Sequence, residues 1–324
     1  MVWLEFLICS ALMIFCAYHL CKEGVLISRR TRLEEGLIGM FFLALATSFP
    51  EMTTGSTAVF FLGKIGLGYG DIVGSIIVNL MILLFLDYYQ GRGRILLRVS
   101  RINRLTGIFA LLLISVVLVF AVLRASGVFV PGLKGLGVES VLIAVMYLGC
   151  LEVVRRTNTK EDDGTSETKG SLLKIWAKFI VLLVIVMLLG MWLAKSGEKI
   201  ANTTGLSQTF IGTLFLGLST SFPEMIVSFT ALRAGSVNMA VGNILGSNLF
   251  DVFIIPFLDG LCGAPILGIL TSGQMIATVV AVLISLIAVI GLFVKRDTSR
   301  RINWDTGLIF TVGLAGFVLL YFIR

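Results

Sequence analysis

The sequence TSFPE occurs twice in this chain, at residues 47–51 and at residues 220–224, and each copy lies inside a long apolar stretch. Each copy places a carboxylate, two hydroxyls and a proline among hydrocarbon side chains. An acidic side chain at the centre of a membrane-spanning helix costs about 2.5–3.5 kcal/mol, and it usually belongs to a functional site facing a cavity. The two copies therefore predict that Glu51 and Glu224 are site residues.

The proline in each copy predicts a break in the helix. Proline has no N–H, so the carbonyl four residues earlier loses its hydrogen bond, at Ala46 in the first copy and at Ser219 in the second. Free carbonyls at membrane depth are tolerated where they line a cavity or meet a ligand. Such oxygen-rich and negative surroundings suit a hard cation.

The hydroxyls of each copy share a helix face with its glutamate, because residues three and four apart are neighbours on a helix. The residues concerned are Thr47 and Ser48 beside Glu51, and Thr220 and Ser221 beside Glu224. A hydroxyl in a spanning helix can instead bond the carbonyl one turn before it, which is a purely structural role. The pattern alone leaves both roles open for each hydroxyl.

The composition indicates a polytopic membrane protein. The chain has 324 residues, of which 57% are hydrophobic and 14% charged, and its mean hydropathy is +1.00. A spanning helix needs about 20 apolar residues. Ten such stretches are predicted, at residues 2–21, 36–62, 69–89, 105–124, 137–154, 175–194, 206–233, 238–260, 268–294 and 305–323.

The charged residues lie mainly in the connections between these stretches. Residues 155–171 are polar, have no apolar period and are interpreted as a linker between a first half, residues 1–154, and a second half, residues 172–324. Twenty of the 26 Lys and Arg residues fall on the linker's side of the membrane, which predicts a cytoplasmic linker and both termini outside. The net charge of +7 therefore reflects topology and does not indicate a nucleic-acid partner.

The two halves align with each other at an offset of 173 residues. Trp3 matches Trp176 and Gly24 matches Gly197, well before the shared motif. Because each half has an odd number of predicted spans, the second half enters the membrane from the opposite side. We therefore predict an all-α membrane protein of ten transmembrane helices in two inverted five-helix repeats, with its substrate bound at the midplane where the broken helices meet.

A second pair of polar stretches follows, now at an offset of 172 residues. Polar residues recur at every fourth position and give one polar helix face. They are Asp71, Ser75 and Asn79 in the first half, and Asn243, Ser247 and Asp251 in the second. Glycines beside them have the spacing that lets two spanning helices approach closely, and we interpret Gly70, Gly74, Gly242 and Gly246 as structural.

The candidate site offers only oxygen ligands. Glu51, Glu224 and Asp251 are possible charges with Asn79 as a neutral partner, and no Lys, Arg or His lies at these depths. Bound cations or protons must compensate these charges. Oxygen ligands suit calcium and sodium, whereas zinc and copper prefer nitrogen and sulfur. Six further acids near span ends are interpreted as solvated caps or interface residues: Glu5, Asp87, Glu139, Glu152, Asp259 and Asp305.

The paired TSxPE segments, each followed by a GSx-rich helix, resemble the alpha repeats of the cation/calcium exchanger superfamily, and most closely those of its prokaryotic sodium/calcium exchangers. The resemblance covers essentially the whole chain and implies a prokaryotic plasma membrane. It implies that Glu51 and Glu224 are calcium ligands and that Asn79 and Asp251 complete the pocket. It also implies sodium sites built from Thr47, Ser48, Thr220, Ser221, Ser75 and Ser247 with the carbonyls of Ala44 and Gly217.

The first half departs from the GNxxGSN pattern of that superfamily. The second half keeps the pattern from Asn243 to Asn248, whereas the first half has Asp71 and Ile76 at the corresponding positions. Any helix-orienting role of those two positions is therefore in question, and the role of Asp71 is not given by the resemblance.

The resemblance implies a secondary antiporter that exchanges sodium for calcium by alternating access. A proton/calcium exchanger and a potassium-dependent exchanger are alternatives within the class, and a cation channel is a weaker one from a different class. No enzyme activity is expected, because no nucleophile with a base accompanies the carboxylates. No cofactor and no protein partner are indicated, and the expected partners are calcium, sodium and the lipid bilayer.

Overall fold

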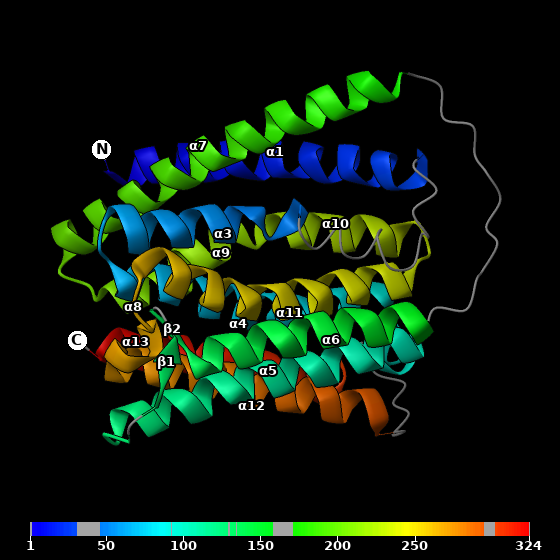
Figure 1. Cartoon of the computed structure of the whole chain (residues 1–324). Coiled ribbons are helices and arrows are strands. Elements are labelled where there is room, and N and C mark those ends of the chain that lie inside the picture. Colours follow the sequence, from blue (N-terminus) through cyan, green and yellow to red (C-terminus); the bar gives the residue numbers. More distant parts are fainter. Residues whose placement is uncertain are drawn as a thin grey trace.

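The computed structural model describes residues 2–30, 46–91, 93–128, 130–133, 135–157, 171–294 and 302–323. Long helices run alongside one another in one bundle, as Figure 1 shows. The helices are α1 (Val2–Arg30), α3 (Phe49–Ser56), α4 (Ile65–Gln90), α5 (Arg101–Ala125), α6 (Val138–Thr157), α7 (Leu172–Thr204), α8 (Gln208–Phe210), α9 (Gly217–Thr220), α10 (Phe222–Arg233), α11 (Val237–Cys262), α12 (Ser272–Phe293) and α13 (Trp304–Phe322).

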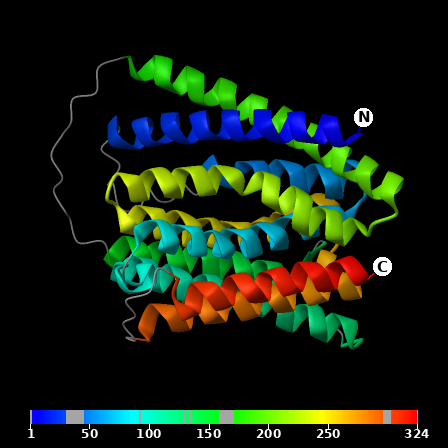
Figure 2. The same ribbon diagram turned by 180° about the vertical axis from the view of Figure 1, so that it is seen from behind.

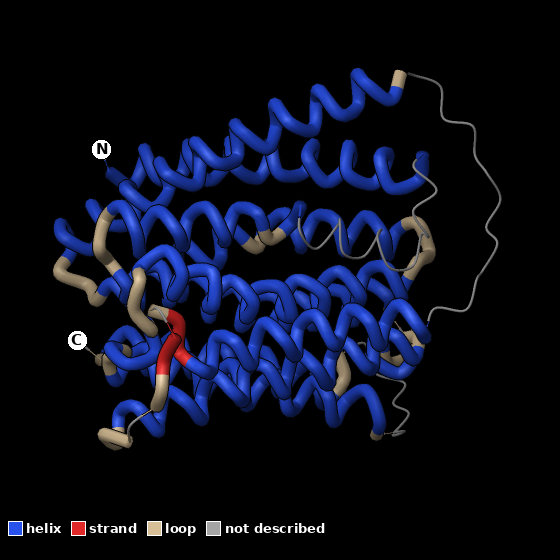
Figure 3. The backbone as a smooth tube through the Cα atoms, in the orientation of Figure 1, coloured by secondary structure: helices blue, strands red, loops and turns tan. Residues whose placement is uncertain are grey.

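Shorter elements lie between these helices. Two π-helical segments, Thr57–Phe61 and Ile211–Leu216, follow α3 and precede α9, and two 3-10 turns are formed by Ile95–Leu97 and Ile266–Ile269. Strands β1 (Gly132–Leu133) and β2 (Leu136–Gly137) pair antiparallel with Gly132 opposite Gly137. Figure 3 shows these strands and most loops at the ends of the bundle. The all-helical class is confirmed, apart from this one small sheet in the described residues.

Eight helical stretches in the described residues are long and apolar enough to cross a membrane. They are Val2–Gly24, Ile65–Gln90, Arg101–Ala125, Leu172–Thr204, Gln208–Arg233, Val237–Cys262, Ser272–Phe293 and Trp304–Phe322, and each overlaps one predicted span. The two remaining predicted spans are residues 137–154, which form most of α6, and residues 36–62, which are helical from α3 through Phe61. Residues 31–45 lie outside the described part of the chain.

The helices are arranged in layers (Figures 1 and 2). The long helices α1 and α7 pack on each other along one side. Next come α3, α9 and α10, then α4 and α11, while α5, α6, α12 and α13 form the opposite side. The apolar windows of α4 and α11 are 83% and 89% buried, against 22% for α7, so α4 and α11 are enclosed by protein.

Contacts between helices recur with the two halves exchanged. α3 packs on α7 while α10 packs on α1, and α4 contacts α12 while α11 contacts α5. Likewise, α13 contacts α4 and α6 contacts α11. The N- and C-terminal ends lie at the same end of the bundle (Figure 1).

Candidate ion-binding site

Each copy of TSFPE lies at a break between helical segments. Ser221 separates α9 from α10 and has φ −82° and ψ −3°. In the first copy, Ser48 has φ −87° and ψ 8° immediately before α3. Pro50 and Pro223 occupy the first turn of the following helix, where a missing N–H breaks no helical hydrogen bond. The helix breaks predicted from the two prolines are confirmed.

Hydroxyls from the two halves meet in the interior. Thr47 Oγ1 lies 3.0 Å from Ser247 Oγ, and Ser75 Oγ lies 3.1 Å from Thr220 Oγ1. Thr47 corresponds to Thr220 in the other half, and Ser75 corresponds to Ser247. The same contact is therefore made twice with the partners exchanged, as two-fold related surfaces do.

Corresponding residues of α4 and α11 also touch each other. Asn79 Nδ2 donates to Asp251 Oδ2 at 3.5 Å, and Asn248 Nδ2 donates to the carbonyl oxygen of Ile76 at 3.4 Å. In each pair the two residues occupy matching positions of the two halves. The predicted polar faces of α4 and α11 thus face one another at the centre of the bundle.

The three acids of the predicted pocket are fully buried. Glu51, Glu224 and Asp251 each have 0% exposure. Both carboxylate oxygens of Glu51, one of Glu224 and one of Asp251 have no hydrogen-bond partner. The other oxygen of Glu224 accepts from Ser48 Oγ at 3.5 Å. Within the described residues no ion pair involves these acids. A buried charge without a partner is strongly unfavourable, so positive charge must reach this site.

The acids lie beside hydroxyls of the other half. Glu51 approaches Ser75 and Thr220, and Glu224 approaches Thr47. Glu51, Glu224 and Asp251 are also close enough to one another to repel electrostatically. The side chains predicted to form one pocket are therefore gathered in one place, although they come from four separate stretches of sequence.

The polar groups gathered here are of several kinds. Among the described residues, no three His, Cys, Asp or Glu side chains form a metal cluster. Hydroxyl and carbonyl oxygens also lie here: Ser221 Oγ is buried without a partner, and the carbonyl of Gly217 accepts from the Ser221 N–H at 3.1 Å. The same carbonyl oxygen also lies 3.5 Å from Thr220 Oγ1. Ala44, the other predicted carbonyl ligand, lies outside the described residues.

Two glycines of α4 bring backbones into direct contact. A Cβ added at Gly74 would lie 2.1 Å from the carbonyl oxygen of Thr213. One added at Gly70 would lie 3.0 Å from the carbonyl oxygen of Thr209. Gly217 has the same property, since its Cβ would lie 2.7 Å from the carbonyl carbon of Gly74. The predicted structural role of Gly70 and Gly74 is confirmed, and their contact brings Ser75 to Thr220.

The expectation for Asp87 and Asp259 was wrong. They were interpreted as solvated caps or interface residues, but both have 0% exposure. The side chain of Asp87 accepts from the backbone N–H of Ile95 at 3.0 Å, and that of Asp259 accepts from Ile266 N–H at 2.8 Å. The two acids occupy corresponding positions and hold the 3-10 turn that follows α4 or α11.

The same expectation was wrong for Glu139 and Asp305. Glu139 is buried and accepts from Arg124 Nε at 2.7 Å. Asp305 is buried against the side chain of Arg94. Distance from a span end was the only signal used for these acids, and it does not reveal that the end is packed against other helices.

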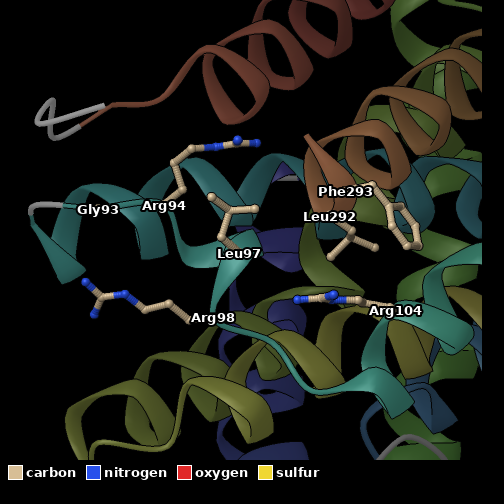
Figure 4. Close-up of a pocket in the computed structure, with 7 residues that line it drawn as sticks. All are labelled: Gly93, Arg94, Leu97, Arg98, Arg104, Leu292 and Phe293. Carbon is tan, nitrogen blue, oxygen red and sulfur yellow. The ribbon is translucent and has the colours of Figure 1, made fainter. Parts of the chain in front are cut away.

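A cavity of about 490 Å³ lies beside the connection between α4 and α5 (Figure 4). Arg94, Arg98 and Arg104 line it together with apolar residues, and no acid is among its lining residues. Arg94 also donates to the carbonyl oxygen of Gly291 at 2.9 Å. None of the residues that line it belongs to the carboxylate site, so the cavity and the site are separate.

These features define a class: an integral membrane helical bundle with a buried, acidic, oxygen-lined site at the meeting point of two broken helices. The family model described as "Sodium/calcium exchanger protein" matches residues 1–154 and 174–323. The chain therefore belongs to the sodium/calcium exchanger protein family.

Individual relatives are consistent with this membership. A putative antiporter, CaxA of Alkalimonas amylolytica, is 24% identical over 330 residues, covering 96% of this chain and 95% of the relative. The sodium/calcium exchanger MaX1 of Methanosarcina acetivorans is 32% identical over 123 residues, covering 38% of this chain and 34% of the relative.

Solved structures share the fold. An H+/Ca2+ exchanger, CAX, has a TM-score of 0.75 at 12% identity, covering 99% of this chain and 85% of the other. The sodium-calcium exchanger NCX_Mj has a TM-score of 0.65 at 21% identity, with both chains fully covered. At these sequence identities the similarity establishes the fold only. Which ions are transported must be inferred from the residues of the site.

Proposed function

We propose that this chain is a secondary antiporter that exchanges sodium for calcium across a membrane by alternating access. The observation that carries the proposal is the group of fully buried carboxylates, Glu51, Glu224 and Asp251, with unpartnered oxygens where two broken helices meet. Membership of the sodium/calcium exchanger family supports it. Such a site is unfavourable without cations, so it must exchange one set of cations for another and not simply release them.

Calcium is bound by Glu51 and Glu224, whose two charges balance one divalent ion. Asn79 and Asp251, 3.5 Å apart, complete the pocket. Sodium ions take the flanking hydroxyl pairs, Thr47 with Ser247 and Ser75 with Thr220, together with Ser48, Ser221 and the carbonyls of Gly217 and Ala44. Calcium and sodium compete for the same carboxylates, and this competition couples their movements.

The fold works as two inverted repeats, residues 1–154 and 172–324, joined by the linker at 155–171. The exchanged contacts between helices and the reciprocal hydroxyl pairs support this division. Inverted repeats with broken helices at the midplane are a common architecture of secondary transporters. An odd number of spans in each repeat places both termini on the side opposite the linker, and the excess of Lys and Arg on the linker's side makes that side the cytoplasmic one.

Two other coupling ions have support. A proton is the alternative counter-ion, because the fold also matches an H+/Ca2+ exchanger with a TM-score of 0.75. Potassium co-transport is another, because the human sodium/potassium/calcium exchanger 1 is 30% identical over 131 residues. A cation channel is the remaining alternative, and the internal two-fold pattern with broken helices favours alternating access over a continuous pore.

Calcium flux in proteoliposomes tests the proposal. Radioactive calcium uptake is measured with gradients of sodium, potassium or protons imposed one at a time and the other two clamped. We expect uptake to follow the outward sodium gradient and to need neither potassium nor a pH gradient. Uptake driven only by a pH gradient would replace sodium by protons, and single-channel currents in a planar bilayer would refute antiport.

Labelling of introduced cysteines tests the topology. Of the native cysteines, Cys9, Cys16, Cys21 and Cys150 are buried, and Cys262 is partly exposed. With Cys262 replaced by serine, a cysteine introduced at Gly164 in the linker should react with an impermeant maleimide in inverted vesicles and not in intact cells. The opposite result would reverse the predicted orientation.

A further inference from the structure

We propose that Asp71 is an additional cation ligand, which binds a sodium ion together with Thr220 and Ser75 in one half of the molecule. The proposal rests on the proposed sodium/calcium exchange and adds a charged ligand that the matching position of the other half lacks. Asp71 has 0% exposure. Its Oδ1 lies 3.1 Å from Thr220 Oγ1, and its Oδ2 has no hydrogen-bond partner.

The surroundings of Thr220 contain more acceptors than protons. Thr220 Oγ1 lies 3.1 Å from Asp71 Oδ1, 3.0 Å from the Leu216 carbonyl oxygen and 3.5 Å from that of Gly217. Ser75 Oγ lies 3.1 Å from the same atom. A threonine hydroxyl has one hydrogen and can satisfy only one of these acceptors, and Ser75 brings only one more. The missing positive charge is what a bound cation supplies.

Asp71 does not make the helix-to-helix hydrogen bonds that its counterpart Asn243 makes. Asn243 donates to the Glu224 carbonyl oxygen at 3.3 Å and to Ser228 Oγ at 3.0 Å, so it holds α10 against α11. An ionised carboxylate cannot donate these bonds. The position that matches Ser228 in the first half is Gly55, which has no side-chain acceptor. Asp71 is directed instead at Thr220, which belongs to the other half.

The charge of this group fits a monovalent ion. Asp71 supplies one negative charge, and Thr220, Ser75 and the Leu216 carbonyl add neutral oxygens. Oxygen ligands of this kind suit hard cations. The nearby Glu51, which also faces Thr220 and Ser75, is needed for calcium under the proposed function. One sodium ion therefore balances Asp71 without depriving calcium of its two glutamates.

Thermal unfolding of the purified full-length protein tests this inference, because an ion that binds only the folded state raises the melting temperature. Sodium chloride is titrated against choline chloride at constant ionic strength without calcium, and calcium is titrated separately without sodium. In Asp71→Asn we expect the half-saturating sodium concentration to rise at least about tenfold, the effect of losing one charged ligand. The half-saturating calcium concentration should stay the same.

Asp259→Asn is the matched control, because it removes an equally buried carboxylate that holds a turn outside the site. Its melting temperature should depend on the sodium concentration in the same way as that of the unmodified protein. Asp71→Ser gives a second neutral replacement if the first yields no folded protein.

An unchanged sodium response in Asp71→Asn would overturn the inference, and so would a change confined to calcium. If the unmodified protein responds to calcium but not to sodium, the proposed sodium coupling fails as well. A failure of the inference alone is therefore distinguishable from a failure of the proposed function.

Discussion

Asn243 and Asp71 occupy corresponding positions on α11 and α4, yet only Asn243 bonds to the broken helix of its own half. Asp71 reaches across to Thr220 in the other half. The two TSFPE copies are identical in sequence, so the difference between the half-sites comes from the helices that support them. A repeated motif can thus keep its ligands while its surroundings change the charge that each half presents.

The largest effect is expected where the halves are most alike. Glu51→Gln and Glu224→Gln should each abolish sodium-driven calcium uptake in proteoliposomes, since losing a charged ligand costs up to about 3 kcal/mol, or roughly a hundredfold in affinity. Glu152→Gln, which changes a partly exposed glutamate on α6 outside the site, should transport normally. Full calcium flux in either site variant would refute the assignment, and a large difference between the two would break the two-fold comparison.

A second comparison concerns two glycines beside the polar faces, Gly74 on α4 and Gly242 on α11. Gly74→Ala would place a Cβ 2.1 Å from the Thr213 carbonyl oxygen, so backbone must move, at a cost of about 1–3 kcal/mol or more. Gly242→Ala would place one 2.9 Å from the side chain of Asn103, which can turn away. Melting temperatures measured in the same detergent should fall much further for Gly74→Ala. Equal losses would show that the contact to Thr213 relaxes as easily as a side chain.

A third comparison exchanges the residues that differ between the halves. Asp251→Asn removes a charge and should weaken calcium binding about tenfold. The double variant Asn79→Asp with Asp251→Asn restores that charge within the same pair, whose side chains lie 3.5 Å apart. Calcium titrations should show recovery of most of the lost affinity. If the double variant binds calcium no more tightly than Asp251→Asn, the acid and the amide cannot be exchanged between these two positions.

The smallest effect concerns support of the second helix break. Ser228→Ala removes an acceptor of Asn243 and should lower the free energy of unfolding by about 1 kcal/mol. Calcium and sodium titrations of the variant should be unchanged, because Ser228 is not a ligand. A shift in either ion's half-saturation, without loss of stability, would mean that Asn243 acts on the site itself.

Much of the site was predictable because charged and polar residues are rare in membrane-spanning helices. The two glutamates, the prolines and the polar face with a period of four were visible in the sequence. The structure places the glutamates and prolines at helix breaks and the polar faces on the continuous helices α4 and α11. Which atoms meet across the halves was not predictable, since the contact of Thr47 with Ser247 depends on how two distant helices pack. The burial of Asp87 and Asp259 was missed for the same reason: their partners are backbone groups of turns that form only in the fold.

The glycine contacts of α4 limit how the protein can move. Where Gly74 and Gly217 meet, backbone lies on backbone and no side chain can change rotamer to let the helices slide. α4 and the second broken helix must therefore translate or rotate as a single body. Relative motion is cheaper where side chains form the contact, as between α1 and Phe215, whose ring lies 5.2 Å from that of Trp3 and 6.3 Å from that of Phe6. Motion during a transport cycle is therefore expected where α1 packs on Phe215, while α4 and the second broken helix stay together at Gly74 and Gly217.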